Sequence, residues 1–234
     1  MKTLGLLGGM SWESTAVYYR LLNQGVAQRL GGLHSAQLLL HSVDFAPLAA
    51  LQAKADWATA AQHLGDAARG LQRAGAQGLV LATNTMHKVA GAIEAASGLP
   101  LLHIADATGT ALLAAGIQHA SLLGTRFTME DDGIVRGRLQ QRFGLQISVP
   151  DADDRALMHC VIYDELCRGL MRPESRAAVV ALIDRQRLRG AQAVILGCTE
   201  IGLLIDTTCS PLPVFDTTAL HAAAAVSWML LETP

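Results

Sequence analysis

One stretch of the chain occurs twice, and this repeat constrains the fold more than any other feature. The first copy begins at Gly75 and reads Gly-Ala-Gln-Gly-Leu-Val-Leu-Ala-Thr-Asn-Thr; the second begins at Gly190 and reads Gly-Ala-Gln-Ala-Val-Ile-Leu-Gly-Cys-Thr-Glu. The two copies start 115 residues apart, so Thr83 in the first corresponds to Cys198 in the second. A hydroxyl and a thiol therefore occupy the same position in two half-chains that are predicted to share one fold.

Each copy has the pattern of a parallel strand that leads into a helix. A helix-ending glycine precedes four or five apolar residues, and a small polar turn follows. A second pair, Leu6 to Gly8 and Leu122 to Gly124, lies 116 residues apart and supports the same duplication. The sequence thus predicts an α/β fold with two similar lobes, each a mainly parallel sheet flanked by helices, related by pseudo-two-fold duplication. We expect residues 1–104 with 216–234 to form the first lobe and residues 105–215 to form the second.

The repeated turns are the natural place for a ligand. In parallel sheets flanked by helices, ligands bind beyond the carboxyl ends of the strands, where N–H groups at helix starts hold anions. We expect the active site in a cleft between the lobes, with Thr83 and Cys198 on opposite sides of one bound molecule. Two proton carriers on opposite faces of one carbon suit stereochemical inversion.

Composition and charge exclude several other classes of protein. The chain has 234 residues, of which 51% are hydrophobic and 16% charged, which is ample material for two cores. A formal charge of −2 gives no support for nucleic-acid binding, and no run of about 18 uncharged apolar residues suggests a membrane span. Met1 and Lys2 are followed at once by strand-like residues, and there is no signal-peptide pattern, so we expect a cytoplasmic protein. The four cysteines lack C-x-x-C spacing and histidine partners, which argues against a metal site.

Local patterns predict the remaining elements. Asp151 to Asp154 has the character of a solvated loop, and Cys160 and Cys167, seven apart in a helical segment, are predicted to be small buried residues on one face. The glycine turn after the first strand is a poor match to a dinucleotide fingerprint. Strands are expected at 3–7, 37–41, 101–104, 120–123 and 145–149, and helices from 56, at 86–96, 106–115, 155–168, 173–189 and 217–231, the last capped by Asp216 and packed on the first lobe.

Four motifs, spread over nearly the whole chain, resemble those of the aspartate/glutamate racemase superfamily. They are Gly8-Gly9-Met10-Ser11-Trp12-Glu13-Ser14-Thr15, Thr83-Asn84-Thr85-Met86-His87, Leu123-Gly124-Thr125 with Thr128-Met129, and Gly197-Cys198-Thr199-Glu200. This resemblance implies two α/β lobes that close over an amino-acid substrate, and a cysteine from each lobe that moves the Cα proton without pyridoxal phosphate. It also implies a homodimer and no cofactor.

Thr83 departs from the two-cysteine pattern, because the first family cysteine aligns with it. In this respect the chain is similar to the broad-specificity amino-acid racemase subgroup. A thiol with a pKa near 8.5 can be poised as a thiolate, whereas an aliphatic hydroxyl is a much poorer base. Cys198 is therefore the expected base, and Thr83 either returns a proton as a weak donor or positions a water.

The resemblance also implies a set of substrate contacts around the two catalytic residues. Backbone N–H groups of the two turns are expected to hold the α-carboxylate. Glu200 stays open between a catalytic role, in which it accepts the thiol proton, and a structural one, and its carboxylate would also raise the thiol pKa; His87 is expected to be an oriented supporting or capping residue rather than a base. The expected substrate-binding residues are Met10, Ser11, Gln52, Asn84, Thr85, Thr125, Thr199 and Glu200.

The substrate stays open between aspartate or glutamate and a broader set of polar amino acids. Relatives with acidic substrates present a cation, but residues 46–52 are uncharged and residues 163–165 contain no lysine or arginine. Lys54, Lys88 and Arg126 would supply a cation only if they point inward. The alternatives are a single-cysteine decarboxylase or isomerase of the same superfamily, and a non-catalytic amino-acid-binding module.

Overall fold

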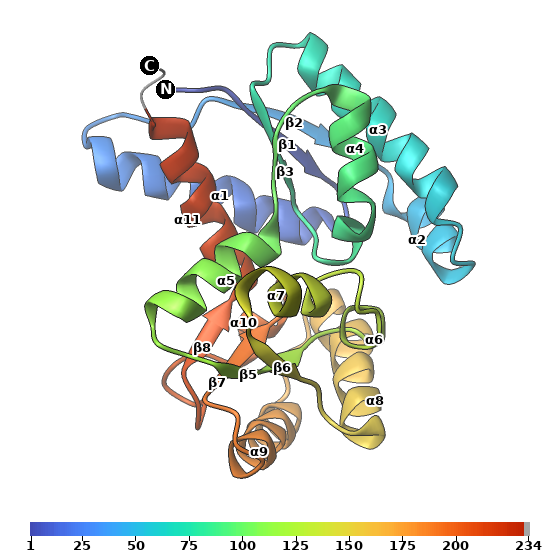
Figure 1. Ribbon diagram of the computed structural model, residues 1–234, viewed down its shortest axis with the longest axis vertical. Coiled ribbons are helices and arrows are strands. Elements are labelled where there is room, and N and C mark those ends of the chain that lie inside the picture. Colours follow the sequence, from blue (N-terminus) through green and yellow to red (C-terminus); the bar gives the residue numbers. More distant parts are fainter. Residues whose placement is uncertain (232–234) are drawn as a thin grey trace. The chain divides into compact units, whose positions relative to one another are not determined.

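The computed structural model describes residues 1–231, which fall into two compact units (Figure 1). The first unit comprises Met1–His103 and the C-terminal segment that begins at His221, and the second comprises Ile104–Leu220. The breaks thus fall at 103/104 and 220/221, near the 104/105 and 215/216 expected from the repeat. Residues 232–234 of the expected first lobe lie outside the described residues.

The two units contain four-stranded sheets of the same topology. The strand pairings of both sheets are parallel, and the strand orders are β2-β1-β3-β4 and β6-β5-β7-β8. Each strand of the first sheet therefore has a counterpart in the second, and the predicted α/β fold with parallel sheets is confirmed. The strands are β1 (Leu4–Gly8), β2 (Leu38–Ser42), β3 (Gly78–Leu81), β4 (Leu101–Leu102), β5 (His119–Leu123), β6 (Gln146–Ser148), β7 (Ala193–Leu196) and β8 (Val214–Asp216).

The strand register explains why the repeat has two offsets. Leu7 pairs with Leu81 in the first sheet, and Leu123 pairs with Leu196 in the second. The two pairs are related by shifts of 116 and 115 residues, the same values as in the sequence repeat. Thr83 and Cys198 consequently occupy equivalent positions, each two residues beyond the last paired residue of its strand.

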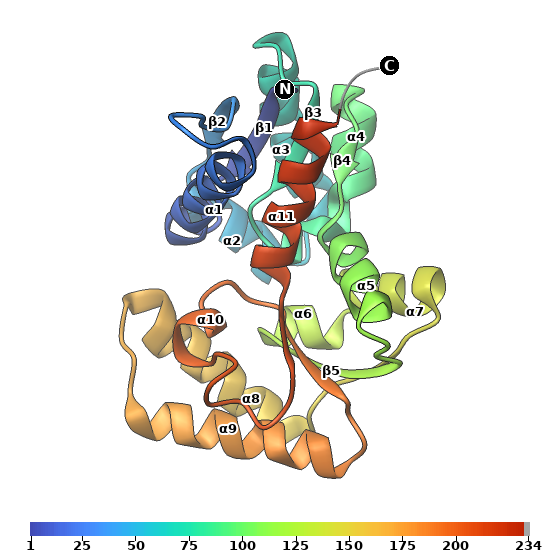
Figure 2. The same cartoon turned by 90° about the vertical axis from the view of Figure 1, so that its left-hand side faces the viewer.

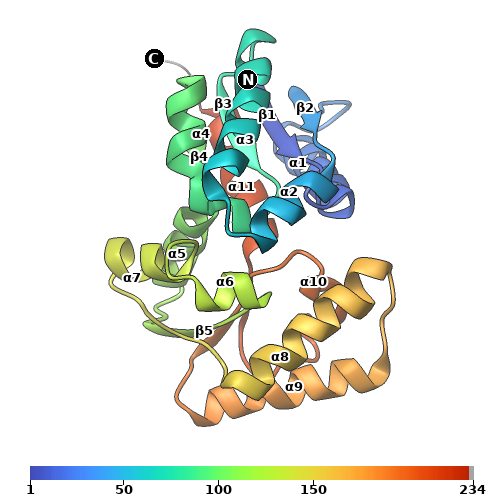
Figure 3. The same cartoon turned by 90° about the vertical axis from the view of Figure 1, so that its right-hand side faces the viewer.

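Helices cover both faces of the first sheet. One face packs on α1 (Trp12–Leu30) and α11 (Thr217–Leu230), which Figure 2 shows in blue and red, through residues such as Tyr18 and Val226. The other face packs on α2, α3 and α4, seen in front in Figure 3. The expectation that the final helix returns to the first lobe is confirmed, and Asp216 accepts hydrogen bonds from the N–H groups of Thr218 and Ala219 at its start. The bounds are Phe45–Ala53 for α2, Trp57–Arg73 for α3 and Ala90–Ser97 for α4.

The second sheet is covered in the same way. One face packs on α5 (Ile104–Ala114) and α7 (Arg136–Phe143), and the opposite face packs on α8 (Ala152–Cys160), α9 (Pro173–Leu188) and α10 (Ile201–Leu204) (Figure 1). A short helix, α6 (Arg126–Glu130), follows β5. In the described part of the chain, no helix combines the length and the apolar character needed to cross a membrane.

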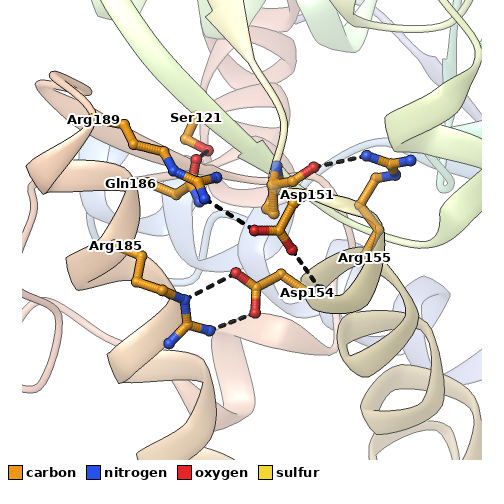
Figure 4. Close-up of polar contacts among 8 residues, drawn as sticks. Ser121, Asp151, Asp154, Arg155, Arg185, Gln186 and Arg189 are labelled. Carbon is orange, nitrogen blue, oxygen red and sulfur yellow. Dashed lines mark hydrogen bonds and ion pairs between the residues drawn. The ribbon is translucent and has the colours of Figure 1, made fainter.

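The predicted loop at residues 151–154 is wrong, because this segment starts helix α8. Asp151 caps the helix by accepting a hydrogen bond from the Asp154 N–H at 3.1 Å, and Arg189 donates to Asp151 at 3.0 Å. Asp154 is buried and forms an ion pair with Arg185 of α9, as Figure 4 shows. Acidic residues in a first helical turn are favourable beside unpaired N–H groups, so the charge run marks a helix start.

The predicted burial of Cys160 and Cys167 is also wrong. Both are exposed. Between them the backbone changes from α-helix to a π-helical turn, η2 (Val161–Glu165), and then to a 3₁₀ turn, η3 (Leu166–Arg168). Seven residues place two side chains on one face only in a regular α-helix, so the spacing argument fails here.

Three smaller differences also follow from local geometry. Residues 45–53 form α2, which starts where Asp44 accepts a hydrogen bond from the Ala46 N–H, although their composition shows little helical periodicity. The strand expected at 101–104 shortens to Leu101–Leu102, because α5 already begins at Ile104. The helix expected at 86–96 begins as a 3₁₀ turn, η1 (Thr85–Val89).

Candidate active site

The Thr83 turn lies at the carboxyl end of β3 in the first unit. Ala82 still belongs to the sheet edge, because its N–H donates to the Leu7 carbonyl at 2.9 Å. Thr83 is half-buried, Asn84 is buried, and Thr85 is the first residue of η1. The sheet therefore ends in three consecutive hydrogen-bonding residues, as the motif predicts.

The Gly8-Gly9 turn lies beside it, because β1 and β3 are neighbours. Gly9 has φ +93° and runs so close to Val43 that a Cβ there would lie 2.2 Å from the Val43 carbonyl oxygen. Its N–H donates to Thr15 Oγ1 at 2.8 Å, and that hydroxyl donates to the Ser11 carbonyl at 2.8 Å. A side chain at Gly9 would displace this network, so glycine is required for the turn that presents Ser11.

The other predicted contacts of the first unit lie near this edge. Ser11 caps α1 by accepting from the Ser14 N–H. Met10 is buried in the cluster that contains Leu48 of α2. Gln52 is buried one turn further along the same helix.

The Cys198 turn ends β7 in the second unit. The Gly197 N–H donates to the Leu123 carbonyl at 2.7 Å, and a Cβ at Gly197 would lie 2.8 Å from Leu122 Cδ1. Thr125 caps α6 at the end of the neighbouring strand β5, and Thr199 Oγ1 accepts a hydrogen bond from the Thr218 hydroxyl at 3.2 Å. The second unit thus gathers Thr125, Cys198, Thr199 and Glu200 at one sheet edge.

A carboxylate lies directly against the Cys198 thiol. The Sγ–H donates to Glu200 Oε2 at 2.8 Å, and Glu200 is buried. Burial is the largest cause that raises the pKa of Cys198 well above its ordinary value, and the Glu200 charge is the next. The thiol is therefore protonated in this structure, with an acceptor for its proton already in contact.

Tyr163 and Cys167 are two neighbours of this pair that sequence reasoning missed as site residues. Burial raises the pKa of Tyr163, with the charges of Cys198, Cys167 and Glu200 as further causes. Burial of its sulfur and then the Glu200 charge raise the pKa of Cys167 to about 12, although the residue as a whole is exposed. Tyr163 lies within the π-helical turn η2 and Cys167 in the 3₁₀ turn η3 that follows it, a break that leaves no periodic signal in the sequence.

Each of the three candidate cations belongs to one unit. Lys88 Nζ lies 5.0 Å from the centre of the Trp57 ring, Lys54 ends α2, and Arg126 begins α6 with its N–H directed to His159 Nδ1 at 3.4 Å. The ring of His87 contacts the Thr83 turn. Its Nδ1 lies 2.8 Å from the Thr83 carbonyl oxygen.

Comparison with solved structures identifies proteins of the same architecture. A candidate Asp/Glu racemase from Yersinia pestis is 53% identical, with a TM-score of 0.94 over 99% of this chain and 100% of that one. An aspartate racemase homologue from Pyrococcus horikoshii is 28% identical, with a TM-score of 0.85 over 98% and 99% of the two chains. The aspartate racemase of Picrophilus torridus is 20% identical and shares the fold, with a TM-score of 0.77 over 98% and 94%.

The family model described as Asp/Glu/Hydantoin racemase matches residues 7–225, which is nearly the whole chain and includes all four motifs. This agrees with the likeness that the motifs indicated. The chain therefore belongs to the Asp/Glu/Hydantoin racemase family.

Proposed function

We propose that the protein is a cofactor-independent amino-acid racemase that inverts Cα by proton transfer between Cys198 and Thr83. One observation carries this proposal. Thr83 and Cys198 occupy equivalent positions beyond β3 and β7 in two sheets of identical strand order, in a chain of a racemase family. The two halves each present one proton carrier at the same turn, which suits a reaction that needs two such carriers.

In this proposal, Cys198 and Glu200 form the base. When the thiol proton moves to Glu200 Oε2, which lies 2.8 Å from Sγ, the thiolate is free to take the Cα proton. The raised thiol pKa means that the thiolate, once formed, is a stronger base toward the Cα proton than an ordinary cysteine thiolate. Glu200 is thus assigned to accept the proton of the resting thiol when the thiolate forms.

On the other side, Thr83 supplies the proton that completes inversion, or holds the water that does so. Proton donation leaves an alkoxide on Thr83 in the first route and a hydroxide in the second. Both are too basic to persist, so each takes a proton from solvent. The turn amides and hydroxyls of Asn84, Thr85 and Thr199 hold the α-carboxylate, on which charge develops as the Cα proton leaves. Met10, Ser11, Gln52 and Thr125 complete the substrate contacts.

The proposed substrates are aspartate and glutamate or a broader set of polar amino acids. Acidic substrates are favoured by the family and by the aspartate racemase homologue. Neutral polar substrates are favoured by α2, which carries Gln52 and no charged residue between Phe45 and Ala53. A panel of amino acids is needed to separate these choices.

Deuterium exchange tests the proposal and its rivals in one assay. Each pure enantiomer of a panel of amino acids is incubated with the enzyme in D₂O, and Cα deuterium, optical rotation and carbon dioxide are measured. Racemisation gives Cα deuterium with loss of optical rotation. Release of carbon dioxide would indicate a single-cysteine decarboxylase, and binding without exchange would indicate a non-catalytic module.

We also propose a cytoplasmic homodimer, which the family resemblance supports. Sedimentation equilibrium at several protein concentrations tests the dimer, since a monomeric mass at all of them contradicts it. Fractionation of cells that express the protein tests its location.

A further inference from the structure

Three histidines from distant parts of the sequence cluster behind the Thr83 turn, all within the first unit. The rings of His87 and His103 lie 4.6 Å apart, and those of His87 and His221 lie 5.5 Å apart. His87 and His221 are 3% and 0% exposed. Burial of two of the three imidazoles disfavours positive charge on them, so their hydrogen bonds depend on which ring nitrogen carries the proton.

The hydrogen-bond partners of His221 determine which of its ring nitrogens carries the proton. Its Nε2 lies 2.8 Å from the Leu102 carbonyl oxygen, which can only accept, so Nε2 carries the hydrogen. Its Nδ1 lies 2.8 Å from the Tyr18 hydroxyl and accepts from it. Burial lowers the pKa of His221 to about 4. His221 is therefore a neutral ring held by two hydrogen bonds.

The same reasoning applies to His87. Its Nδ1 lies 2.8 Å from the Thr83 carbonyl oxygen, so Nδ1 is the protonated nitrogen. Burial, followed by the nearby His103 and His221, lowers the pKa of His87 well below its ordinary value. The backbone N–H of His87 also donates to the Asn84 carbonyl, at 3.1 Å. One buried residue thus holds the carbonyl groups of both Thr83 and Asn84.

We propose that His87 is a positioning residue, whose Nδ1–H fixes the peptide plane between Thr83 and Asn84. The peptide bond is planar and trans, so its C=O and N–H point in opposite directions. A hydrogen bond that draws the Thr83 carbonyl toward the histidine cluster turns the Asn84 N–H away from the cluster, toward the side where the proposed substrate carboxylate binds. This inference rests on the proposed function of the Thr83 turn.

Three substitutions separate positioning from packing. In His87→Asn the side-chain NH₂ falls near the place of Nδ1, in His87→Gln it falls near the place of Nε2, and His87→Leu removes the donor. Positioning through Nδ1 predicts that Asn retains most of kcat/KM, while Gln and Leu lose about 10²-fold, the cost of a misplacement of about 1 Å. Packing alone predicts the opposite order, because Gln is closer to His in volume than Asn is.

The measurement is kcat/KM for the best substrate of the deuterium assay, with thermal unfolding of each variant to verify that it is folded. Activity of Gln equal to or above that of Asn, among folded variants, overturns the proposal. The result expected is the ranking wild type, Asn, then Gln and Leu together.

A second measurement is independent of activity. Ring ¹⁵N chemical shifts of the wild-type protein between pH 5.5 and 8 are expected to show His87 neutral and protonated at Nδ1. A neutral ring protonated at Nε2, or a ring that is charged at pH 6, overturns the proposal. If the wild type exchanges no amino acid, the proposed function fails, while this spectrum still decides the state of His87.

Discussion

The two repeated turns occupy the same place in their sheets but differ in what lies behind them. The Thr83 carbonyl receives a hydrogen bond from a buried imidazole, whereas the Cys198 sulfur donates to a buried carboxylate. The first contact fixes a backbone direction, and the second holds a proton. Duplication has thus preserved the position of the reactive residue and changed the chemistry that surrounds it.

The difference extends to the residues that follow. Thr85 corresponds to Glu200, and His87 corresponds to Gly202. A Cβ at Gly202 would lie 3.2 Å from Asp216 Oδ2, so a side chain at this position would require the Asp216 carboxylate to shift. The Thr83 turn, which lacks a thiol, is held by His87, whereas the thiol of the Cys198 turn lies against the Glu200 carboxylate.

Cys198→Ser tests the asymmetry most severely. We expect a loss of turnover of about 10³-fold or more, because a hydroxyl cannot serve as the thiolate base, while general acid–base assistance alone is worth about 10²–10⁴-fold. Racemisation and thermal unfolding are measured together. Activity near that of the wild type in this folded variant would mean that Cys198 is not the base.

Thr83→Ala and Thr83→Cys test the other side. Loss of a proton donor is expected to lower turnover by about 10²-fold, the lower end of the range for general acid–base assistance, whereas Thr83→Cys restores a second thiol of similar size and raises turnover. Cα deuterium is followed from each pure enantiomer, and the larger changes are expected for the one whose proton faces position 83. If neither variant differs from the wild type, Thr83 is only a wall of the pocket.

Acid is expected to weaken the first unit, where the histidine cluster lies. His221 has a pKa of about 4 when folded, against about 6.5 when unfolded, so the unfolded chain binds the proton more tightly. Stability is therefore lost as pH falls from about 6.5 toward 4, by up to about 3 kcal/mol at 1.36 kcal/mol for each pKa unit. Urea unfolding at a series of pH values measures this loss. The control is His221→Leu, which should be less sensitive to acid over the same range; an equal slope in both proteins contradicts the assignment.

Glu200→Gln tests the carboxylate. The Glu200 charge raises the thiol pKa, so its removal is expected to lower that pKa and shift iodoacetamide alkylation of Cys198 to lower pH. Racemisation is expected to fall by about 10-fold, because the acceptor for the thiol proton is lost. Alkylation of the Cys198→Ser variant measures the reactivity of the other cysteines, and this value is subtracted. An unchanged alkylation profile would show that Glu200 does not control the thiol.

Much of the fold could be predicted because strands and their turns leave local signals. Apolar runs that end in small polar residues marked β3 and β7, and the offsets of 115 and 116 anticipated the paired positions in both sheets. The start of α8 was missed because aspartates suit both solvated loops and helix caps. Only the ion pair between Asp154 and Arg185, which are far apart in the chain, distinguishes the two.

The site was predictable in part for the same reason. The residues of the two turns are contiguous in sequence, so motifs indicated them, whereas Tyr163 lies in a π-helical turn and Cys167 in the 3₁₀ turn after it, and these turns leave no sequence period. The histidine cluster joins residues 87, 103 and 221, and only tertiary packing brings them together. The motifs therefore indicated the two turns but not the groups that contact them from elsewhere in the chain.

The closeness of Gly202 to the Asp216 carboxylate has an evolutionary consequence. A lineage that began with two identical halves can diverge through single substitutions, but the return path is narrower. A histidine at 202 would press on Asp216, which also caps α11, so the effect of this substitution depends on the residue at 216. Such coupling makes the divergence directional, and the two halves of this chain are no longer interchangeable by descent.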